Sequence, residues 1–493
     1  MSNLGEERGT IGAEDEEAIA VTLRKTKIVC TLGPASESPE VLVQLMEAGM
    51  NVARINMAHG ELEDHAARIR AVREASQASG AVVPVLMDIK GPEVRIGKLK
   101  EPYVTLVPGG ELTLTTVELE GDASRISVNY AGLPEDVSEG STILIDDGLI
   151  ELSVLESGGT DIRCRIVSGG ALKPRKGVNL PGVRTRLPGV TERDVKHIHF
   201  GIREQVDIIA ASFVRKAEDI MEIRQILEEH GAGHIQIISK IENDEGVENL
   251  DAIIEVSDGI MVARGDLGVE IPVEDVPALQ EEMIHKCNLA GKPVIVATHM
   301  LESMQVNPRP TRAEVSDVAN AVIQGTDCIM LSGETAAGKY PVESVRRMAS
   351  IAAKTESLAD HRLQFRTRQV LHATTTTEVI SQAAVGSSLD LDAKAILTPT
   401  ESGFTARMVS KYRPKAPIIA ITPEPTTIAK LCLLRGVIPV LGERAESTDA
   451  MFESAVDGGR KTGLLQDGDF VVISSGVPVG KAGATNLIKI MQV

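Results

Sequence analysis

The segment IISKIENDEG, residues 237–246, ends an apolar run with two opposite charges, Lys240 and Glu242. Residues i and i+2 of an extended chain point to the same side, so both charged groups leave one face of the predicted strand. Burying charges on one face is costly unless neighbouring groups compensate each of them. We therefore expect this strand end to carry groups that compensate both charges.

Polar residues also follow most of the other short apolar runs of the chain. They are Arg54 and Asn56, Asp88 and Lys90, Ser212, Arg264 and Asp266, Thr298, and Ser332 and Glu334. Each alone has an ordinary explanation, because polar residues commonly close a strand or cap the next helix. Six or seven such strand ends together favour an active site, since barrel enzymes gather their catalytic groups at the carboxyl ends of the strands.

Two of these residues predict a metal site. Glu242 and Asp266 end consecutive strands, which would place two carboxylates side by side at one barrel edge. Such a pair beside an open pocket suits Mg²⁺ or Mn²⁺. The alternative, that Glu242 pairs only with Lys240 and Asp266 caps a helix at RGDLG, stays open. Arg54, Lys240 and Arg95 would supply positive charge for a phosphate and a carboxylate, although each considered alone is more commonly part of a surface salt bridge.

Strands and helices alternate along most of the chain, which is typical of parallel strands with crossover helices. The predicted strands are residues 27–31, 52–56, 83–88, 206–212, 236–240, 259–263, 294–298 and 328–332. The predicted helices include residues 39–48, 62–77, 217–230, 276–290, 312–324 and 342–355, and Thr311 with Glu314 predicts a capping box. Eight strand–helix units predict a TIM (β/α)₈ barrel, and a doubly wound open sheet ranks second on strand count.

Composition shifts divide the chain into four predicted parts. Residues 1–21 form an acidic N-terminal tail, and residues 22–90 with 188–360 form the barrel. Residues 91–187 alternate short β segments with glycines, which predicts a small inserted β-barrel domain. Residues 361–493 resume the βα alternation too closely for a second barrel, so we expect a C-terminal open α/β domain.

Charge and cysteine content narrow the class of protein. The 493 residues carry a formal charge of -19, which argues against a general nucleic-acid or membrane binder. Five cysteines without CxxC spacing argue against zinc or a disulfide framework and suit the cytoplasm. The acidic leader lacks the features of a signal peptide, so export is not expected.

Several long segments resemble the pyruvate kinase family in order and spacing. They are KIVCTLGPAS, DIKGPEVR, KGVNLPG, ISKIENDEGV, MVARGDLGVEIP, VATHMLESM, NPRPTRAEVSDVANAV and CIMLSGETAAGKYPVE. The resemblance runs from about Thr26 to the C-terminus. It implies a barrel with a β insertion after the third strand and an α/β C-terminal domain. It also implies transfer of the phosphoryl group of phosphoenolpyruvate to ADP, giving ATP and pyruvate in the final step of glycolysis, with Mg²⁺ and K⁺ as cofactors.

The resemblance also implies roles for individual residues. Glu242 and Asp266 match the Mg²⁺ ligands, Lys240 and Arg54 match the cations that meet the phosphoryl group, and Thr298 matches the threonine near the carbon that is protonated, through a bound water. Substrate would contact Arg54, Lys240, Gly265, Asp266 and Thr298, and Ser332 is a further catalytic candidate. The nucleotide or its phosphates would contact Pro34, Asn56, His59, Arg95 and Lys176, the last from the insertion, whose closure would complete the site.

The predicted K⁺ site departs from the family pattern. Its expected ligands are Asn56, Asp88 and the carbonyl of Ile89, which stands where the family has threonine. Ala58 replaces a serine hydroxyl that normally helps to hold K⁺, whereas Glu93 is the residue of K⁺-dependent members. We expect weaker K⁺ binding. His299 stands where glutamine is common, and its simplest interpretation is a tolerated neutral neighbour of Thr298.

The segment TPTESGFTAR, residues 398–407, resembles the family's loop for an effector phosphate. Its candidate ligands are Thr398, Thr400, Ser402, Gly403 and Thr405. Glu401 would disfavour a sugar bisphosphate, and an unliganded helix start is the alternative. The family further implies a homotetramer. Because the sequence ends at Val493, we do not expect the additional C-terminal domain of some bacterial members.

Two other functions are alternatives to phosphoryl transfer. A metal-dependent lyase or aldolase would use the same barrel and metal, but it has no need for the nucleotide clamp that Lys176 and Arg95 predict. A catalytically silent barrel would have lost strand-end residues, whereas Arg54, Lys240, Glu242, Asp266 and Thr298 are all present.

Overall fold

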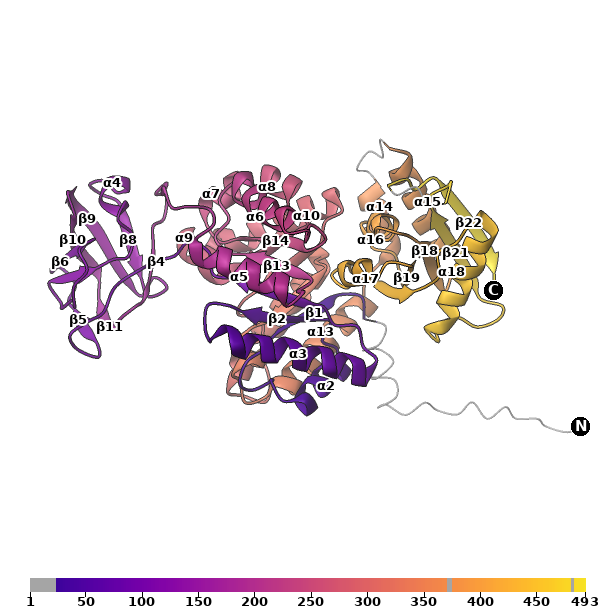
Figure 1. Cartoon of the computed structure of the whole chain (residues 1–493), viewed down its shortest axis with the longest axis horizontal. Coiled ribbons are helices and arrows are strands. Elements are labelled where there is room, and N and C mark those ends of the chain that lie inside the picture. The colour runs from indigo at the N-terminus through magenta and orange to yellow at the C-terminus, as the bar shows by residue number, and fades with distance from the viewer. Residues whose placement is uncertain (1–23, 370–374, 480–482) are drawn as a thin grey trace, which may run out of the picture. The chain divides into compact units, whose positions relative to one another are not determined.

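The computed structural model describes residues 24–369, 375–479 and 483–493 (Figure 1). The predicted acidic tail, residues 1–21, lies outside the described residues. The chain divides into two compact units. One comprises the described residues up to Ala53, Arg70–Pro84 and Met300–Val493, and the other comprises Arg54–Ile69 and Val85–His299. Because this division cuts through one strand of the barrel, Val52–Asn56, the four predicted domain boundaries stay predictions.

Eight strands of the described chain close into a barrel in the order β1-β17-β16-β15-β14-β13-β3-β2. Their bounds are β1 Lys27–Thr31, β2 Val52–Asn56, β3 Val85–Ile89, β13 Ile208–Ala211, β14 Gln236–Ile241, β15 Gly259–Ala263, β16 Val294–Ala297 and β17 Cys328–Leu331. Strand pairing is parallel between β1 and β17 and along the run β3, β13, β14, β15 and β16, and all eight predicted strands are present. The third begins two residues later than predicted, since Pro84 has no N–H for the ladder. The prediction of a TIM barrel is confirmed.

Helices follow the strands as the sequence predicted, with small shifts at their ends. The six predicted ones are α2 Pro39–Glu47, α3 Leu62–Ser79, α6 Ala217–Glu229, α10 Val276–Ala290, α11 Arg312–Gln324 and α13 Pro341–Ser357. Five that we did not name are α5 Glu192–Arg203, α7 Asp244–Glu248, α8 Leu250–Val256, α9 Arg264–Glu270 and α12 Gly333–Ala336. The capping box at Thr311 and Glu314 is confirmed, and Thr191 with Asp194 forms another that would have revealed α5.

The insertion forms one seven-stranded sheet, β4-β12-β8-β9-β10-β6-β7, and a separate pair, β5 with β11. The bounds are β4 Val94–Arg95, β5 Val104–Leu106, β6 Glu111–Thr115, β7 Arg125–Ser127, β8 Thr142–Ile145, β9 Ile150–Gly158, β10 Asp161–Ser168, β11 Gly170–Leu172 and β12 Gly177–Asn179, with α4 at Leu133–Asp136. A bridge between Ile96 and Val128 joins the two edges of the larger sheet. The sheet therefore rolls up around its apolar core as the predicted small β-barrel, which we call the lid.

The C-terminal part forms an open five-stranded sheet in the order β20-β19-β18-β21-β22. The bounds are β18 Ala395–Pro399, β19 Ile418–Thr422, β20 Val437–Leu441, β21 Phe470–Ser475 and β22 Leu487–Gln492, with helices α14 His361–Gln369, α15 Thr376–Asp390, α16 Phe404–Ser410, α17 Pro425–Leu431 and α18 Thr448–Lys461. Four strands coincide with the apolar runs AKAILTPT, APIIAIT, VIPVL and DFVVISSG, which account for the predicted βα alternation of this part. The fifth, β22, pairs antiparallel with β21 and was not predicted, because its polar residues at an edge give no continuous apolar run.

A buried ion pair within the first unit predicts a large loss of stability. Arg413 donates from both terminal nitrogens to Asp327, at 2.8 Å each, and both side chains are 3% exposed. Asp327→Asn should lower the free energy of unfolding by about 3–5 kcal/mol, since it leaves a buried guanidinium without its counter-charge. Asp392→Asn, at the exposed pair with Lys415, is the control and should leave the melting temperature almost unchanged. Equal melting shifts for the two variants would contradict this prediction.

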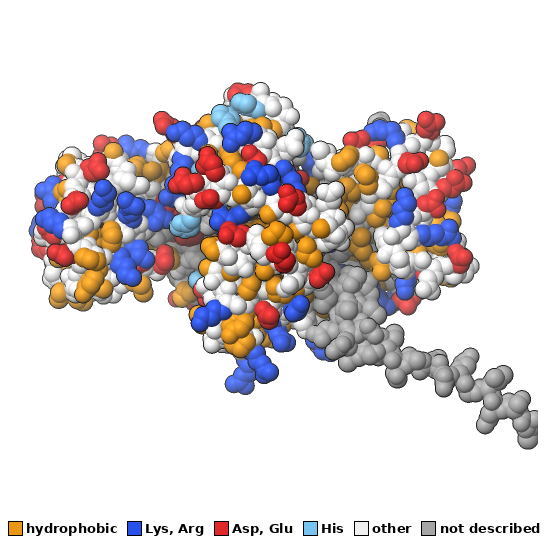
Figure 2. All heavy atoms as spheres, turned by 60° about the horizontal axis from the view of Figure 1, so that its bottom comes forward, with side chains coloured by type: hydrophobic (Ala, Val, Ile, Leu, Met, Phe, Trp, Pro, Cys, Tyr) orange, Lys and Arg blue, Asp and Glu red, His pale blue; other side chains and the backbone are white. Residues whose placement is uncertain are grey.

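Surface charge and helix hydropathy add little to the assignment of a function. Figure 2 shows positive and negative side chains interspersed on the visible face, with hydrophobic side chains between them. Within the described ranges, every helix is too short or too polar to span a bilayer.

Candidate active site

Four charged side chains from three strands meet at the mouth of the barrel. Arg54 of β2 contacts Asp88 of β3, with 2.7 Å between Nε and Oδ2. Lys240 Nζ, at the end of β14, lies 3.3 Å from Asp88 Oδ1 and 3.0 Å from Glu242 Oε1. All four are at least nine-tenths buried, with Glu242 only 1% exposed. The two charges of IISKIENDEG are therefore compensated, by each other and by the Arg54–Asp88 pair.

Two groups that directly follow the neighbouring strand β13 hold this cluster in place. Ser212 Oγ accepts from Lys240 Nζ at 2.7 Å and lies 2.7 Å from the carbonyl of Ile89. The backbone N–H of Phe213, whose φ is 56°, donates to Glu242 Oε2 at 2.7 Å. Lys240 thus has an oxygen partner for each of its three N–H bonds. We named Ser212 as a strand end but missed the Phe213 amide, because a backbone donor leaves no mark in the sequence.

The two predicted metal-binding carboxylates carry excess negative charge. Burial raises the pKa of Glu242 to about 7, and nearby Asp266 adds to the rise while Lys240 opposes it. Burial also raises the pKa of Asp266, again against Lys240. Burial would lower the pKa of Lys240, but Asp88 and Glu242 reverse this and raise it, so the ammonium stays charged. A cation between the two carboxylates would relieve their repulsion, and this donor set suits a hard divalent ion.

Metal ligation by protein groups alone would be incomplete at this site. In the described ranges there is no group of three or more His, Cys, Asp or Glu side chains placed to hold a metal. A pair of carboxylates fits an ion that completes its coordination with water and substrate oxygens, as Mg²⁺ does. The residues present therefore fit the predicted type of site.

Thr298 follows β16 in a strained conformation. Its φ is 69° and that of His299 is 55°, which is unusual for a β-branched residue and its neighbour. Thr298 Oγ1 accepts from the N–H of Gly265 at 2.8 Å, and Arg264 donates to the Thr298 carbonyl at 2.6 Å. In this conformation the Thr298 hydroxyl meets the N–H of Gly265, in the first turn of α9. In this structure the Gly265 amide, a predicted substrate contact, is bound by Thr298.

A cleft of about 330 Å³ brings other predicted residues together. Its walls include His59, Arg95, Lys176 and Asp266. Lys176 Nζ lies 2.7 Å from Asp146, and Arg95 Nε lies 2.6 Å from Glu93. Both cations are partly exposed and reach the cleft from the lid. Two predicted residues, Pro34 and Ser332, belong to the other compact unit, and Ser332 donates its N–H to Glu334 at 2.7 Å.

The predicted K⁺ ligands already have protein partners. Asp88 binds Arg54 and Lys240, and the Ile89 carbonyl accepts from Ser212. Asn56 Oδ1 accepts from the N–H of Ala58 at 3.0 Å. Carbonyl and carboxylate oxygens have further lone pairs, so these contacts leave capacity for an ion.

Three of the five predicted effector residues, Thr400, Ser402 and Thr405, line a pocket of about 80 Å³ in the C-terminal part. Gly403 has a φ of 80° and donates to Thr400 Oγ1 at 3.0 Å, whereas Thr398 is fully buried. The sequence did not reveal Arg444, which also lines the pocket and contacts Glu401 at 2.8 Å and Glu424 at 2.5 Å. A residue about forty positions away from the loop gives no local signal.

Comparisons with known proteins show the family of this chain. A model described as pyruvate kinase, barrel domain, matches residues 23–345, and one described as pyruvate kinase, alpha/beta domain, matches residues 378–491. The pyruvate kinase of Bacillus licheniformis is 55% identical over 475 residues, 96% of this chain and 81% of that protein. Those of Geobacillus stearothermophilus and Sporosarcina psychrophila are each 54% identical over 95% of this chain and 80% of their own length. The chain belongs to the pyruvate kinase family.

Proposed function

We propose that the buried cluster of Arg54, Asp88, Lys240 and Glu242 carries the reaction of this enzyme, the transfer of a phosphoryl group from phosphoenolpyruvate to ADP. The observation that carries the proposal is the environment of Lys240, a buried ammonium with three oxygen partners at the mouth of the barrel. A substrate oxygen can replace one of these partners without exposing the charge. A fixed cation stabilises a transition state best where negative charge develops.

The family is metal-dependent, and we propose Mg²⁺ or Mn²⁺ as the ion. Glu242 and Asp266 would hold it, since both carboxylates are costly to ionise side by side. When bound, the ion would neutralise charge on the phosphoryl and carboxylate oxygens of the substrate. Phe213 donates its backbone N–H to Glu242 Oε2 and so fixes the orientation of this carboxylate.

Arg54 and Lys240 would have different roles toward the phosphoryl group. Arg54 is held by Asp88 and would grip the phosphoryl oxygens of phosphoenolpyruvate. Lys240 would stabilise the phosphoryl group during its transfer and then the enolate oxygen that remains on the product. Arg95 and Lys176 would meet the phosphates of ADP from the lid, together with Asn56, His59 and Pro34. The substrate carboxylate would lie at Gly265 and Asp266.

Protonation of the enolate gives pyruvate, and we propose that it takes place beside Thr298. The hydroxyl of Thr298 lies 2.6 Å from the Ala297 carbonyl, so it would orient a water that delivers the proton and would not itself act as a base. The strained backbone at Thr298 supports a functional role, because a β-branched residue adopts this conformation only at a cost. Ser332 stays a further catalytic candidate.

A coupled assay of pyruvate formation from phosphoenolpyruvate and ADP with Mg²⁺ tests this proposal. The wild-type enzyme is compared with Lys240→Met and Glu242→Gln. Wild-type activity indistinguishable from that of both variants would contradict the proposed site.

We expect the enzyme to need K⁺ as well. Asn56, Asp88 and the Ile89 carbonyl would hold it, and Ala58 offers no hydroxyl. Replacing K⁺ with tetramethylammonium should lower kcat by at least about tenfold. The bound K⁺ would add positive charge beside the negatively charged phosphoenolpyruvate and ADP. Ala58→Ser should lower the half-saturating K⁺ concentration about fivefold, the effect of one added polar ligand. An unchanged rate without K⁺ would refute this prediction.

The pocket of the C-terminal sheet supports a second, regulatory site for a phosphorylated effector. Thr400, Ser402 and Thr405 would offer hydroxyls to a phosphate. Thr398 and Gly403 were also named as ligands and stay proposals. Glu401 and Glu424 both bind Arg444, so its charge is compensated and the pocket favours a ligand with few negative charges. The family resemblance supports a homotetramer in the cytoplasm.

A further inference from the structure

The chain leaves the lid through residues 183–187, which we call the strap. The strap follows β12, which itself follows Lys176, and leads to α5 of the barrel. Its residues Val183, Thr185 and Leu187 line the cleft. On the lid side, Arg186 contacts Glu135 at 2.7 Å and Asp136 at 2.8 Å. The strap is therefore both a wall of the cleft and the connection that carries Lys176.

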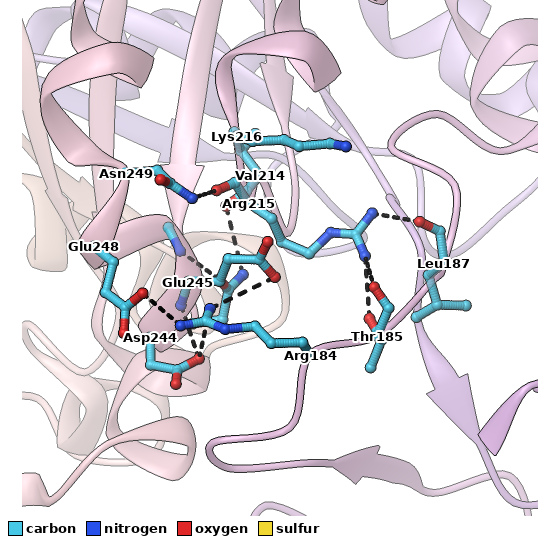
Figure 3. Close-up of polar contacts among 12 residues, drawn as sticks. Arg184, Thr185, Leu187, Val214, Arg215, Lys216, Asp244, Glu245, Glu248 and Asn249 are labelled. Carbon is cyan, nitrogen blue, oxygen red and sulfur yellow. Dashed lines mark hydrogen bonds and ion pairs between the residues drawn. The ribbon is translucent and has the colours of Figure 1, made fainter. Parts of the chain in front are cut away.

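The barrel side of the strap is fixed by Arg184 (Figure 3). Its guanidinium lies 2.5 Å from Glu248, 3.7 Å from Glu245 and 4.0 Å from Asp244. All three carboxylates belong to α7, the short helix that begins two residues after Glu242. A single exposed ion pair contributes little to stability, but one guanidinium shared by three carboxylates forms a network. Arg184 therefore ties the strap to the segment that follows a proposed metal ligand.

A second arginine closes the contacts into a ring. Arg215 donates to the carbonyl of Thr185 at 3.1 Å and to that of Leu187 at 2.5 Å. The carbonyl of Arg215 in turn accepts from Asn249, at the end of α7, at 2.8 Å. Figure 3 shows the strap, α7 and the segment at Arg215 joined in this way. Arg215 stands two residues after Phe213, whose N–H holds Glu242, and α7 begins two residues after Glu242, so both segments that bind the strap adjoin groups of the proposed metal site.

We propose that Arg184 is a positioning residue for phosphoryl transfer: it fixes the strap to α7 and so holds Lys176 of the lid at the cleft beside Glu242. The inference rests on the proposed roles of Lys176 and Glu242. Loss of Arg184 removes the contacts between the strap and α7, so that Arg215 alone holds the barrel side of the strap while Arg186 still holds its lid side. The lid then spends less time with Lys176 in place, which weakens the binding of ADP more than that of phosphoenolpyruvate, whose proposed contacts lie on the barrel.

The test is Arg184→Ala in the full-length enzyme. The KM for ADP should rise about fivefold, the factor that corresponds to the loss of a small ion-pair network, and the KM for phosphoenolpyruvate should change less than about twofold. Amide hydrogen exchange in residues 183–187 should become faster. Arg184→Lys should recover part of the ADP affinity, because an ammonium can meet one of the three carboxylates.

Arg163→Ala is the matched control. Arg163 is also half exposed and also contacts two carboxylates, Glu111 at 3.4 Å and Glu156 at 3.1 Å, but both of these lie within the lid. It should leave both KM values unchanged. In a double-mutant cycle, Glu248→Gln added to Arg184→Ala should cost nothing further, since the two residues act through one contact.

Three results would overturn the inference, and they differ in what else they contradict. Unchanged amide exchange of the strap in Arg184→Ala would show that Arg184 does not fix it, whatever the role of Lys176. Faster exchange with an unchanged KM for ADP would overturn the inference together with the proposed nucleotide contact of Lys176. An equal rise in KM for Arg163→Ala would also overturn it.

Discussion

Lys240→Met should lower kcat about 1000-fold. The ammonium is the one proposed cation that meets both the phosphoryl group and the enolate, and removing even one neutral donor to developing negative charge commonly costs about 10²–10³ in kcat. The loss should appear in kcat more than in the KM for phosphoenolpyruvate, because Arg54 and the metal site still bind the substrate. Steady-state kinetics in the coupled assay, with a check of folding by circular dichroism, measure both parameters.

Lys27→Met is the control for this prediction. Lys27 is also a buried lysine on a barrel strand, 8% exposed, but its Nζ donates to the carbonyl of Val437 at 2.7 Å. It lies in the other compact unit from the cluster around Lys240. Its replacement should cost stability and leave kcat within about threefold of wild type. Equal losses of kcat in the two variants would mean that burial of a lysine, and not its place beside Glu242, explains the effect.

Glu242→Gln should weaken the binding of Mn²⁺ at least about 100-fold. The substitution keeps the shape of the side chain and an oxygen for the N–H of Phe213, so it removes one charge with little change in packing. The loss of a unit charge at about 4 Å from a cation, at the effective dielectric of a protein, corresponds to several kcal/mol. Calorimetry of Mn²⁺ binding to the free enzyme measures the effect without activity, and high concentrations of metal should restore part of the activity.

Glu270→Gln separates a ligand from a merely nearby carboxylate. Glu270 lies on the cleft wall, as Asp266 does, burial raises its pKa as it does that of Glu242, and it accepts from Asn179 at 2.8 Å. Its amide variant should change the affinity for Mn²⁺ less than about threefold. If Glu242→Gln bound Mn²⁺ as tightly as the wild type, the metal site would have to be sought away from Glu242.

The elements of the barrel could be predicted from the sequence because each carries its own local signal. Short apolar runs bounded by polar residues predicted all eight strands, and Thr311 with Glu314 predicted the start of α11. The local sequence signal was weaker where an element depended on its pairing with another strand. The edge strand β22 is held by its antiparallel pairing with β21, and Lys489 interrupts the apolar run within its own six residues.

Part of the candidate active site could also be predicted from the sequence. Alternation along an extended strand requires Lys240 and Glu242 to share a face, and the ends of parallel strands predicted that Arg54 and Asp88 would lie near them. The sequence could not say which oxygens would meet the lysine. Ser212 and Asp88 do so because β13 and β3 are neighbours in the closed sheet, although more than a hundred residues separate them along the chain.

The sequence by itself determined the chemical types at the site, the faces from which they project and the family to which the chain belongs. Tertiary structure alone decided the groups that hold them: the N–H of Phe213 on Glu242, the strained turn at Thr298, Arg444 in the second pocket, and Arg184 and Arg215 on the strap. The physical reason is the same for each. Side-chain type and spacing are local properties, whereas a backbone donor or a distant arginine acquires its role only when folding closes the distance.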